Sequence, residues 1–191
     1  MAGQIGVFCV RIADMNEGFE AMLTGGHPNS LGRTVDVVEA VLATPARLAE
    51  LYDCYGSADE VVRLRVSSAM KRVQAARPDL VVPYFDRLID EIGALDQASA
   101  QWTLAILFQV GAPDMTADQF ARAKALVQRN LAEHQDWIVL NTSIDVLVGW
   151  AREDAALRAW LGPHLQRLRR DGRKSVSGRA EKALKALDAM G

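Results

Sequence analysis

The chain has few of the residues that usually carry chemistry or cross-linking. Of its 191 residues, two are cysteine, three are histidine and 6% are aromatic. Cys9 and Cys54 give neither a disulfide framework nor a metal-binding spacing, and both are expected to be reduced, buried thiols. No histidine has a cysteine, an acid or a second histidine at ligand spacing. No metal site and no other cofactor is therefore expected.

Long apolar runs and a strong net charge are also missing. No stretch approaches the ~18 apolar residues of a membrane span, and the first residues carry no basic leader. A soluble, cytoplasmic protein is expected. The formal net charge of −2 gives no general attraction to nucleic acid or to anionic membranes. The charge is unevenly spread, because residues 161–191 carry a net +5 and the rest of the chain carries −7.

What the chain has in quantity is aliphatic residues in a repeated pattern. Half of its residues are hydrophobic. Four segments can be aligned on Asp59, Asp96, Asp136 and Arg173, which are 37, 40 and 37 residues apart. Apart from a weak run at residues 5–12, no strand-like alternation is present. A period of this length, with each unit read as helix–turn–helix, is typical of an α-solenoid.

Capping and stop signals predict where the helices begin and end. Thr116 and Gln119 have the spacing of a capping box, as do Ser57 and Glu60, while Pro78 predicts the end of a helix. A single hairpin of this size cannot bury its own apolar face, so the hairpins are expected to share one core. The expected pairs are 14–24 with 31–43, 45–55 with 58–76, 79–94 with 97–110, 117–133 with 137–152, and 154–170 with 175–189.

These pairs predict the domain organisation. Residues 1–13 match no repeat and are expected to be an N-terminal extension, either without fixed structure or added by an upstream start. Residues 14–191 are expected to form a single repeat array.

The second of these helix pairs resembles a HEAT repeat. The signature of that repeat is an Asp, then Val-Arg, then a small residue followed by a large one, and here Asp59 precedes Val62-Arg63 and Ala69-Met70. Most of the chain is similar to small bacterial HEAT-like proteins of the armadillo type, which have no established activity. The resemblance implies an all-α, right-handed solenoid of about five hairpins whose second helices line the concave side. It also implies that Arg63 bridges to an acid of the adjacent repeat.

The first functional hypothesis is a non-enzymatic scaffold that binds a protein or peptide along the concave side. No nucleophile, base and acid set can be assembled from the sequence, whereas polar residues recur at similar positions of the second helices. Trp102 is either a core tryptophan or, if its position faces the groove, an exposed aromatic residue between arginines, which suits a peptide or a base. The expected contact residues are Arg65, Arg72, Gln101, Trp102, Gln109, Asn141, Asp145, Arg179 and Lys182.

The alternative hypothesis is DNA binding by a protein related in fold to the alkylpurine DNA glycosylases, which use HEAT-like repeats. Those enzymes need a basic groove for the phosphates and an acid beside aromatic residues for the damaged base. This chain is net acidic, and Ile106, not an aspartate, lies one helical turn after Trp102. The sequence therefore favours a protein partner.

A glycine-rich loop ahead of an expected helix gives one further candidate. Its spacing does not match the phosphate-binding loop of nucleotide-binding proteins, and an arginine stands where that loop has its lysine. Free N–H groups at a helix start can still hold a carboxylate or phosphate. The candidate anion site consists of His27, Asn29, Ser30 and Arg33, and the alternative is an ordered turn capped by Asn29 or Ser30.

Overall fold

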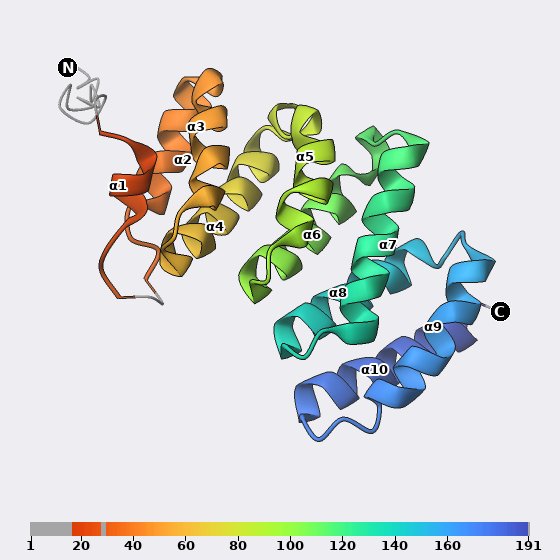
Figure 1. The fold of residues 1–191 in the computed structure, drawn as a ribbon. Coiled ribbons are helices and arrows are strands. Elements are labelled where there is room, and N and C mark those ends of the chain that lie inside the picture. The colour runs from red at the N-terminus through yellow and green to blue at the C-terminus, as the bar shows by residue number, and fades with distance from the viewer. Residues whose placement is uncertain (1–16, 28–29, 191) are drawn as a thin grey trace, which may run out of the picture.

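The computed structural model describes residues 17–27 and 30–190. Within these ranges it contains ten α-helices and no β-strand, so the all-helical class predicted from the sequence is confirmed (Figure 1). The extension predicted at residues 1–13 lies outside the described residues. The α-helices are α1 (Phe19–Leu23), α2 (Thr34–Ala43), α3 (Leu48–Asp53), α4 (Glu60–Ala76), α5 (Phe85–Asp90), α6 (Ala98–Gly111), α7 (Ala117–Glu133), α8 (Trp137–Trp150), α9 (Ala155–Leu168) and α10 (Lys174–Asp188).

Short polar side chains cap the starts of α7, α8 and α9, where they accept hydrogen bonds from backbone N–H groups that a helix start leaves free. Thr116 and Gln119 form the predicted capping box of α7, with Gln119 N donating to Thr116 Oγ1 (3.2 Å) and Thr116 N to Gln119 Oε1 (3.0 Å). The Asp136 carboxylate accepts from Ile138 N (2.8 Å) at α8, and that of Asp154 accepts from Leu157 N (2.8 Å) at α9.

The capping box predicted at Ser57 and Glu60 is wrong. Helix α4 is capped by Asp59, whose carboxylate accepts from Val61 N at 2.8 Å. The Ser57 hydroxyl accepts from Asp59 N at 3.2 Å, so it fixes the residue that caps the helix. Ser57 and Asp59 can both cap a helix, so the predicted start of α4 fell on the wrong one of the two.

The first helices of the early pairs are broken into short pieces. The helix predicted over 79–94 consists of three 3₁₀ turns, η4 (Pro78–Leu80), η5 (Val82–Tyr84) and η6 (Ile92–Ala94), around α5. Pro83 lies in the first turn of η5. Because proline lacks an N–H and fixes its φ angle, it starts a helical turn more readily than it continues one. The segment over 45–56 is similarly η2 (Pro45–Arg47), α3 and η3 (Cys54–Gly56).

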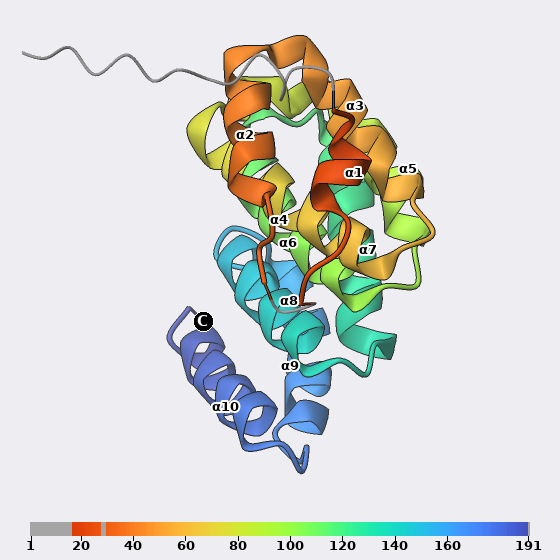
Figure 2. The ribbon, with the colours of Figure 1, turned by 90° about the vertical axis from the view of Figure 1, so that its left-hand side faces the viewer.

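The even-numbered helices pack side by side in chain order. Helix α2 contacts α4, α4 contacts α6, α6 contacts α8, and α8 contacts α10. Helix α7 lies against α5 and α8, and α9 lies against α10. Figures 1 and 2 show the pairs following one another, with α1 and α10 at opposite ends. The starts of α4, α6, α8 and α10 are 38, 39 and 37 residues apart, close to the predicted spacing.

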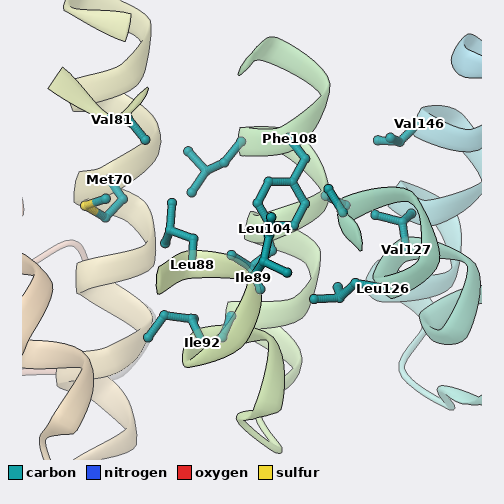
Figure 3. Packing of buried hydrophobic residues seen from close by; sticks show 14 of the residues in the cluster. Met70, Val81, Leu88, Ile89, Ile92, Leu104, Phe108, Leu126, Val127 and Val146 are labelled. Atoms are coloured by element: carbon teal, nitrogen blue, oxygen red, sulfur yellow. The ribbon is translucent and has the colours of Figure 1, made fainter. Parts of the chain in front are cut away.

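One hydrophobic core runs through these layers. Leu88 of α5, Leu104 and Phe108 of α6, and Val127 of α7 have no exposed surface and belong to the same cluster (Figure 3). Cys54 is also in this cluster as a free, buried thiol, as expected, and burial raises its pKa to about 11. Each pair therefore buries apolar surface against its neighbours, which a single hairpin could not do.

Arginines of two consecutive first helices make the same bond. Arg129 of α7 donates through Nη2 to the Gly93 carbonyl oxygen at 2.8 Å, and Arg167 of α9 donates through Nη2 to that of Leu131 at 2.8 Å. Arg167 lies 38 residues after Arg129, and Leu131 lies 38 residues after Gly93. Each arginine thus satisfies a carbonyl near the end of the preceding first helix, where helical bonding leaves carbonyls free.

Candidate functional site

The second helices of four pairs leave one side uncovered, and we call this surface the second-helix face. Helices α4, α6, α8 and α10 each carry exposed or half-buried residues spaced three or four apart, so these residues share one side of their helix. The opposite sides are buried in the core. The second-helix face consists of Leu64, Ser68 and Lys71 on α4, Trp102, Ile106 and Gln109 on α6, Ile138, Thr142 and Asp145 on α8, and Ser175, Arg179 and Lys182 on α10.

A lysine and a tryptophan join α4 to α6 on this face. Lys71 Nζ lies 3.8 Å from the centroid of the Trp102 ring, within the range of a cation–π interaction. Burial lowers the pKa of Lys71 to about 8, and the neighbouring charge of Arg72 adds to the decrease. The electron-rich indole face acts in the opposite sense, because it stabilises the charged ammonium. Because Lys71 lies over its ring, Trp102 is half-buried rather than freely exposed.

An ion pair joins α8 to α10. Arg179 Nη1 donates to Asp145 Oδ2, and this hydrogen bond raises the pKa of Arg179. Both side chains are about half exposed, at 45% and 51%. An ion pair with this exposure contributes little to folding stability, so its charges remain available to a ligand that can rearrange them.

The middle of the second-helix face is almost free of charge. Helix α6 contains no Asp, Glu, Lys or Arg, and Asp145 is the only such residue in α8. Positive charge is therefore confined to α4 and α10, on either side of Trp102, Ile106 and Ile138. A face with charges at two ends and apolar residues between them differs from the continuous basic stripe that follows a phosphate backbone.

The structure brings six of the nine predicted contact residues to the surface. Trp102, Gln109, Asp145, Arg179 and Lys182 lie on the second-helix face, and Arg72 is exposed at its edge on α4. The sequence-based choice missed Lys71, which covers Trp102. The spacing of Lys71 from Leu64, two helical turns, is the signal that places it on this side.

Arg65 was expected in the contact row, and the structure corrects this. Only 1% of Arg65 is exposed, and it is the largest fully buried side chain in the described part of the chain. Its guanidinium donates to four backbone carbonyl oxygens, at the end of α1 and in the loop that follows it. These belong to Leu23, Gly25 (2.6 Å), His27 (3.2 Å) and Ser30 (3.1 Å). Arg65 therefore holds the loop and neither flanks Trp102 nor meets a partner.

Gln101 and Asn141 are also buried, at 3% and 8% exposure, and are removed from the contact row. Gln101 Nε2 donates to the Leu95 carbonyl at 2.7 Å, and Gln101 Oε1 accepts from Asn130 Nδ2 at 3.0 Å. The Asn141 side-chain oxygen has no hydrogen-bond partner among the described residues. Both side chains lie toward neighbouring helices, one position away from the half-exposed Trp102 and Thr142.

Arg63 has the structural role that the resemblance implied, but with a different partner. Its Nε donates to Oε1 of Gln97, at the start of the next pair, where an acid was expected. Its Nη1 donates to the Ser57 carbonyl at 2.6 Å. Gln97 in turn donates to the Glu60 carbonyl at 3.1 Å, so the bond set joins two successive pairs.

The loop proposed as an anion site uses its polar groups internally. Arg33 pairs with Glu17 (2.5 Å) and Asp36 (3.1 Å), so two carboxylates already neutralise its charge. The Ser30 hydroxyl accepts from Gly32 N at 3.1 Å, and the carbonyls of His27 and Ser30 accept from Arg65. Asn29 lies outside the described residues. These described groups are thus engaged in bonds within the protein.

Neither a metal centre nor a membrane span is found in the described part of the chain. Across residues 17–27 and 30–190, no three His, Cys, Asp or Glu side chains come together in a way that could hold a metal ion. None of the helices described here is long and apolar enough to cross a membrane.

Comparison with known proteins gives no family for this chain. No family model, no curated protein and no solved structure matches it. The geometry of the second-helix face is therefore the basis on which a function is proposed.

Proposed function

We propose that the chain is a HEAT-like α-solenoid that binds a protein or peptide on its second-helix face, without catalysing a reaction. The solenoid interpretation is supported by the regular succession of even-numbered helices and by the repeated arginine–carbonyl bonds of Arg129 and Arg167. In this proposal the array is right-handed and the second-helix face is its concave side. The five helix pairs then form one scaffold.

The charge distribution of the second-helix face is the observation that carries the binding proposal. Ile106 and Ile138 lie in a nearly uncharged centre, next to Trp102 with Lys71 over its ring. Lys71 and Arg72 lie on one side of this centre, and Arg179, Lys182 and Asp145 on the other. Protein interfaces commonly combine an apolar, aromatic centre with a polar rim of both charge signs. A nucleic acid would instead require cations along its whole path.

Affinity purification from the native cell extract tests this proposal. The tagged wild type is compared with a Lys71→Ala/Trp102→Ala double variant and with Trp137→Ala, a matched control. Trp137 is 49% exposed but lies in the first turn of α8, turned about 100° away from Ile138. We expect a protein partner that co-purifies in stoichiometric amount with the wild type and with Trp137→Ala. This partner should be lost with the Lys71→Ala/Trp102→Ala double variant.

Two results would contradict the proposal. Equal recovery of every partner with the double variant would show that the second-helix face is not the binding surface. Recovery of nucleic acid alone, released by salt, would favour the DNA-binding alternative, since phosphate contacts weaken steeply with salt concentration.

A further inference from the structure

A depression of about 500 Å³ lies between α8 and α10, at the last pair of the array. Its floor is aliphatic, with Ile144 and Val148 from α8 and Ala183 and Ala186 from α10. Ile144 and Ala183 are buried, whereas Val148 and Ala186 are half-buried. The depression therefore offers apolar surface that no described segment of the chain covers.

The shape of the depression follows its two helices. Lining residues extend along α10 from Lys174 to Ala186, which corresponds to ~18 Å at the rise of an α-helix. Gly178 lies between them, and a Cβ atom added there would meet no atom within 4 Å. Small residues in the middle of α10 thus leave an elongated space, in which side chains of a second helix could be accommodated.

The rim of the depression is basic. Lys174, Arg179 and Lys182 line it, and Asp145 is its only acid. Asp145 is already paired with Arg179, whereas neither Lys174 nor Lys182 forms an ion pair with a described residue. Two uncompensated cations on an aliphatic depression are complementary to carboxylates that flank an aliphatic stripe.

We infer that the α8–α10 depression binds an amphipathic helix of a partner protein, with aliphatic residues at helical spacing in the depression and Asp or Glu along both flanks. The inference rests on the proposed function, because it specifies the partner of one end of the second-helix face. The floor is aliphatic and contains no aromatic ring on which a base could stack. An acidic protein helix fits this surface better than a nucleic acid does.

Selection from a displayed library of peptides about sixteen residues long, slightly longer than the depression, tests the inference. Binders are selected separately on the wild type and on two variants. Gly178→Leu fills the depression, and Lys174→Glu/Lys182→Glu reverses its rim charge. Gly162→Leu is the matched control for volume, since a Cβ there also meets no atom within 4 Å and Gly162 is on α9. Arg169→Glu/Arg170→Glu, at the end of α9, is the matched control for charge.

The expected result is enrichment of peptides with Leu, Ile or Val at i and i+4 and acids beside them. A selected peptide should bind at least about tenfold more weakly to Gly178→Leu and to the lysine double variant than to either control. The inference would be overturned by enrichment of basic peptides, by no enrichment, or by peptides that bind Gly178→Leu as well as wild type. Tighter binding of a random DNA duplex than of every selected peptide would also overturn it.

Failure of this inference can be separated from failure of the proposed function. The same variants are used in the affinity purification from native extract. A protein partner that is lost with Lys71→Ala/Trp102→Ala but kept by Gly178→Leu would leave the proposed function intact and place the partner elsewhere on the second-helix face. A partner kept by both would contradict both.

Discussion

Arg65 should be a major contributor to the stability of the N-terminal end, and replacing it with alanine tests this. The guanidinium is buried and donates to carbonyls of four residues between positions 23 and 30. A hydrogen bond to a charged group contributes about 1.5–3 kcal/mol. The four bonds do not add, because the cation also loses its hydration on burial and the loop carbonyls of the variant regain water.

The net effect expected for Arg65→Ala is about 2–4 kcal/mol of lost unfolding free energy. Urea denaturation followed by circular dichroism measures it. Amide hydrogen exchange should show that protection falls first in α1 and hardly at all in α10, since Arg65 holds the loop that follows α1. A loss below about 1 kcal/mol, or uniform loss of protection, would refute the assigned role.

Gly32 offers an internal control for the same contact. Its φ of +52° favours glycine, and an added Cβ would lie 2.9 Å from Arg65 Cζ. The guanidinium cannot move aside without breaking its bonds, so Gly32→Ala should cost about 1–2 kcal/mol from the backbone and about 1–3 kcal/mol more from the clash. Only the second cost disappears in the Arg65→Ala background. A double-mutant cycle should therefore give a coupling of at least about 1 kcal/mol, and additive effects would contradict the contact.

Two further predictions concern the core and the second-helix face. Gly111→Ala places a Cβ 2.2 Å from Cζ of the fully buried Phe85 and should lower the unfolding free energy by about 1–3 kcal/mol. An added Cβ at Gly178 meets no atom within 4 Å, so Gly178→Ala should raise the unfolding free energy by up to about 1 kcal/mol. Thermal unfolding of both variants measures these changes. Lys71 should titrate near pH 8 by ¹⁵N NMR of its ammonium group, well below its usual range. Because the folded state then binds fewer protons than the unfolded state, wild-type stability should rise relative to Lys71→Met between about pH 8 and 10.5, and a pH-independent difference would contradict the lowered pKa.

Much of the helical pattern could be predicted because its signals are local. The capping atoms of Thr116, Asp136 and Asp154 are within three residues of the N–H groups they bind, so sequence spacing is enough to find them. Pro78 likewise ends α4 through its effect on the residue before it. The start of α4 was predicted at Ser57 rather than Asp59 because both residues can accept such bonds, and only the folded backbone selects between them.

The candidate site was less predictable because burial depends on segments distant in sequence. Arg65 follows Leu64 directly, yet it points at a loop about forty residues earlier, while Leu64 stays half exposed. A shift of one residue turns a helical side chain by about 100°, so a small error in the assumed face exchanges buried for exposed positions. The same error placed Gln101 and Asn141 in the contact row instead of Lys71 and Thr142.

Site-specific photo-crosslinking tests the central claim most directly, because it reports which surface a partner touches. A photoreactive benzoylphenylalanine is introduced at Gln109, an exposed position of the second-helix face on α6, or at Ala125, an exposed position on α7. Irradiation in the native cell is followed by mass spectrometry of the adducts. We predict a defined protein adduct from position 109 and none from position 125. Adducts from position 125 alone, or nucleic acid as the only species bound at position 109, would contradict the proposal that this face binds a protein.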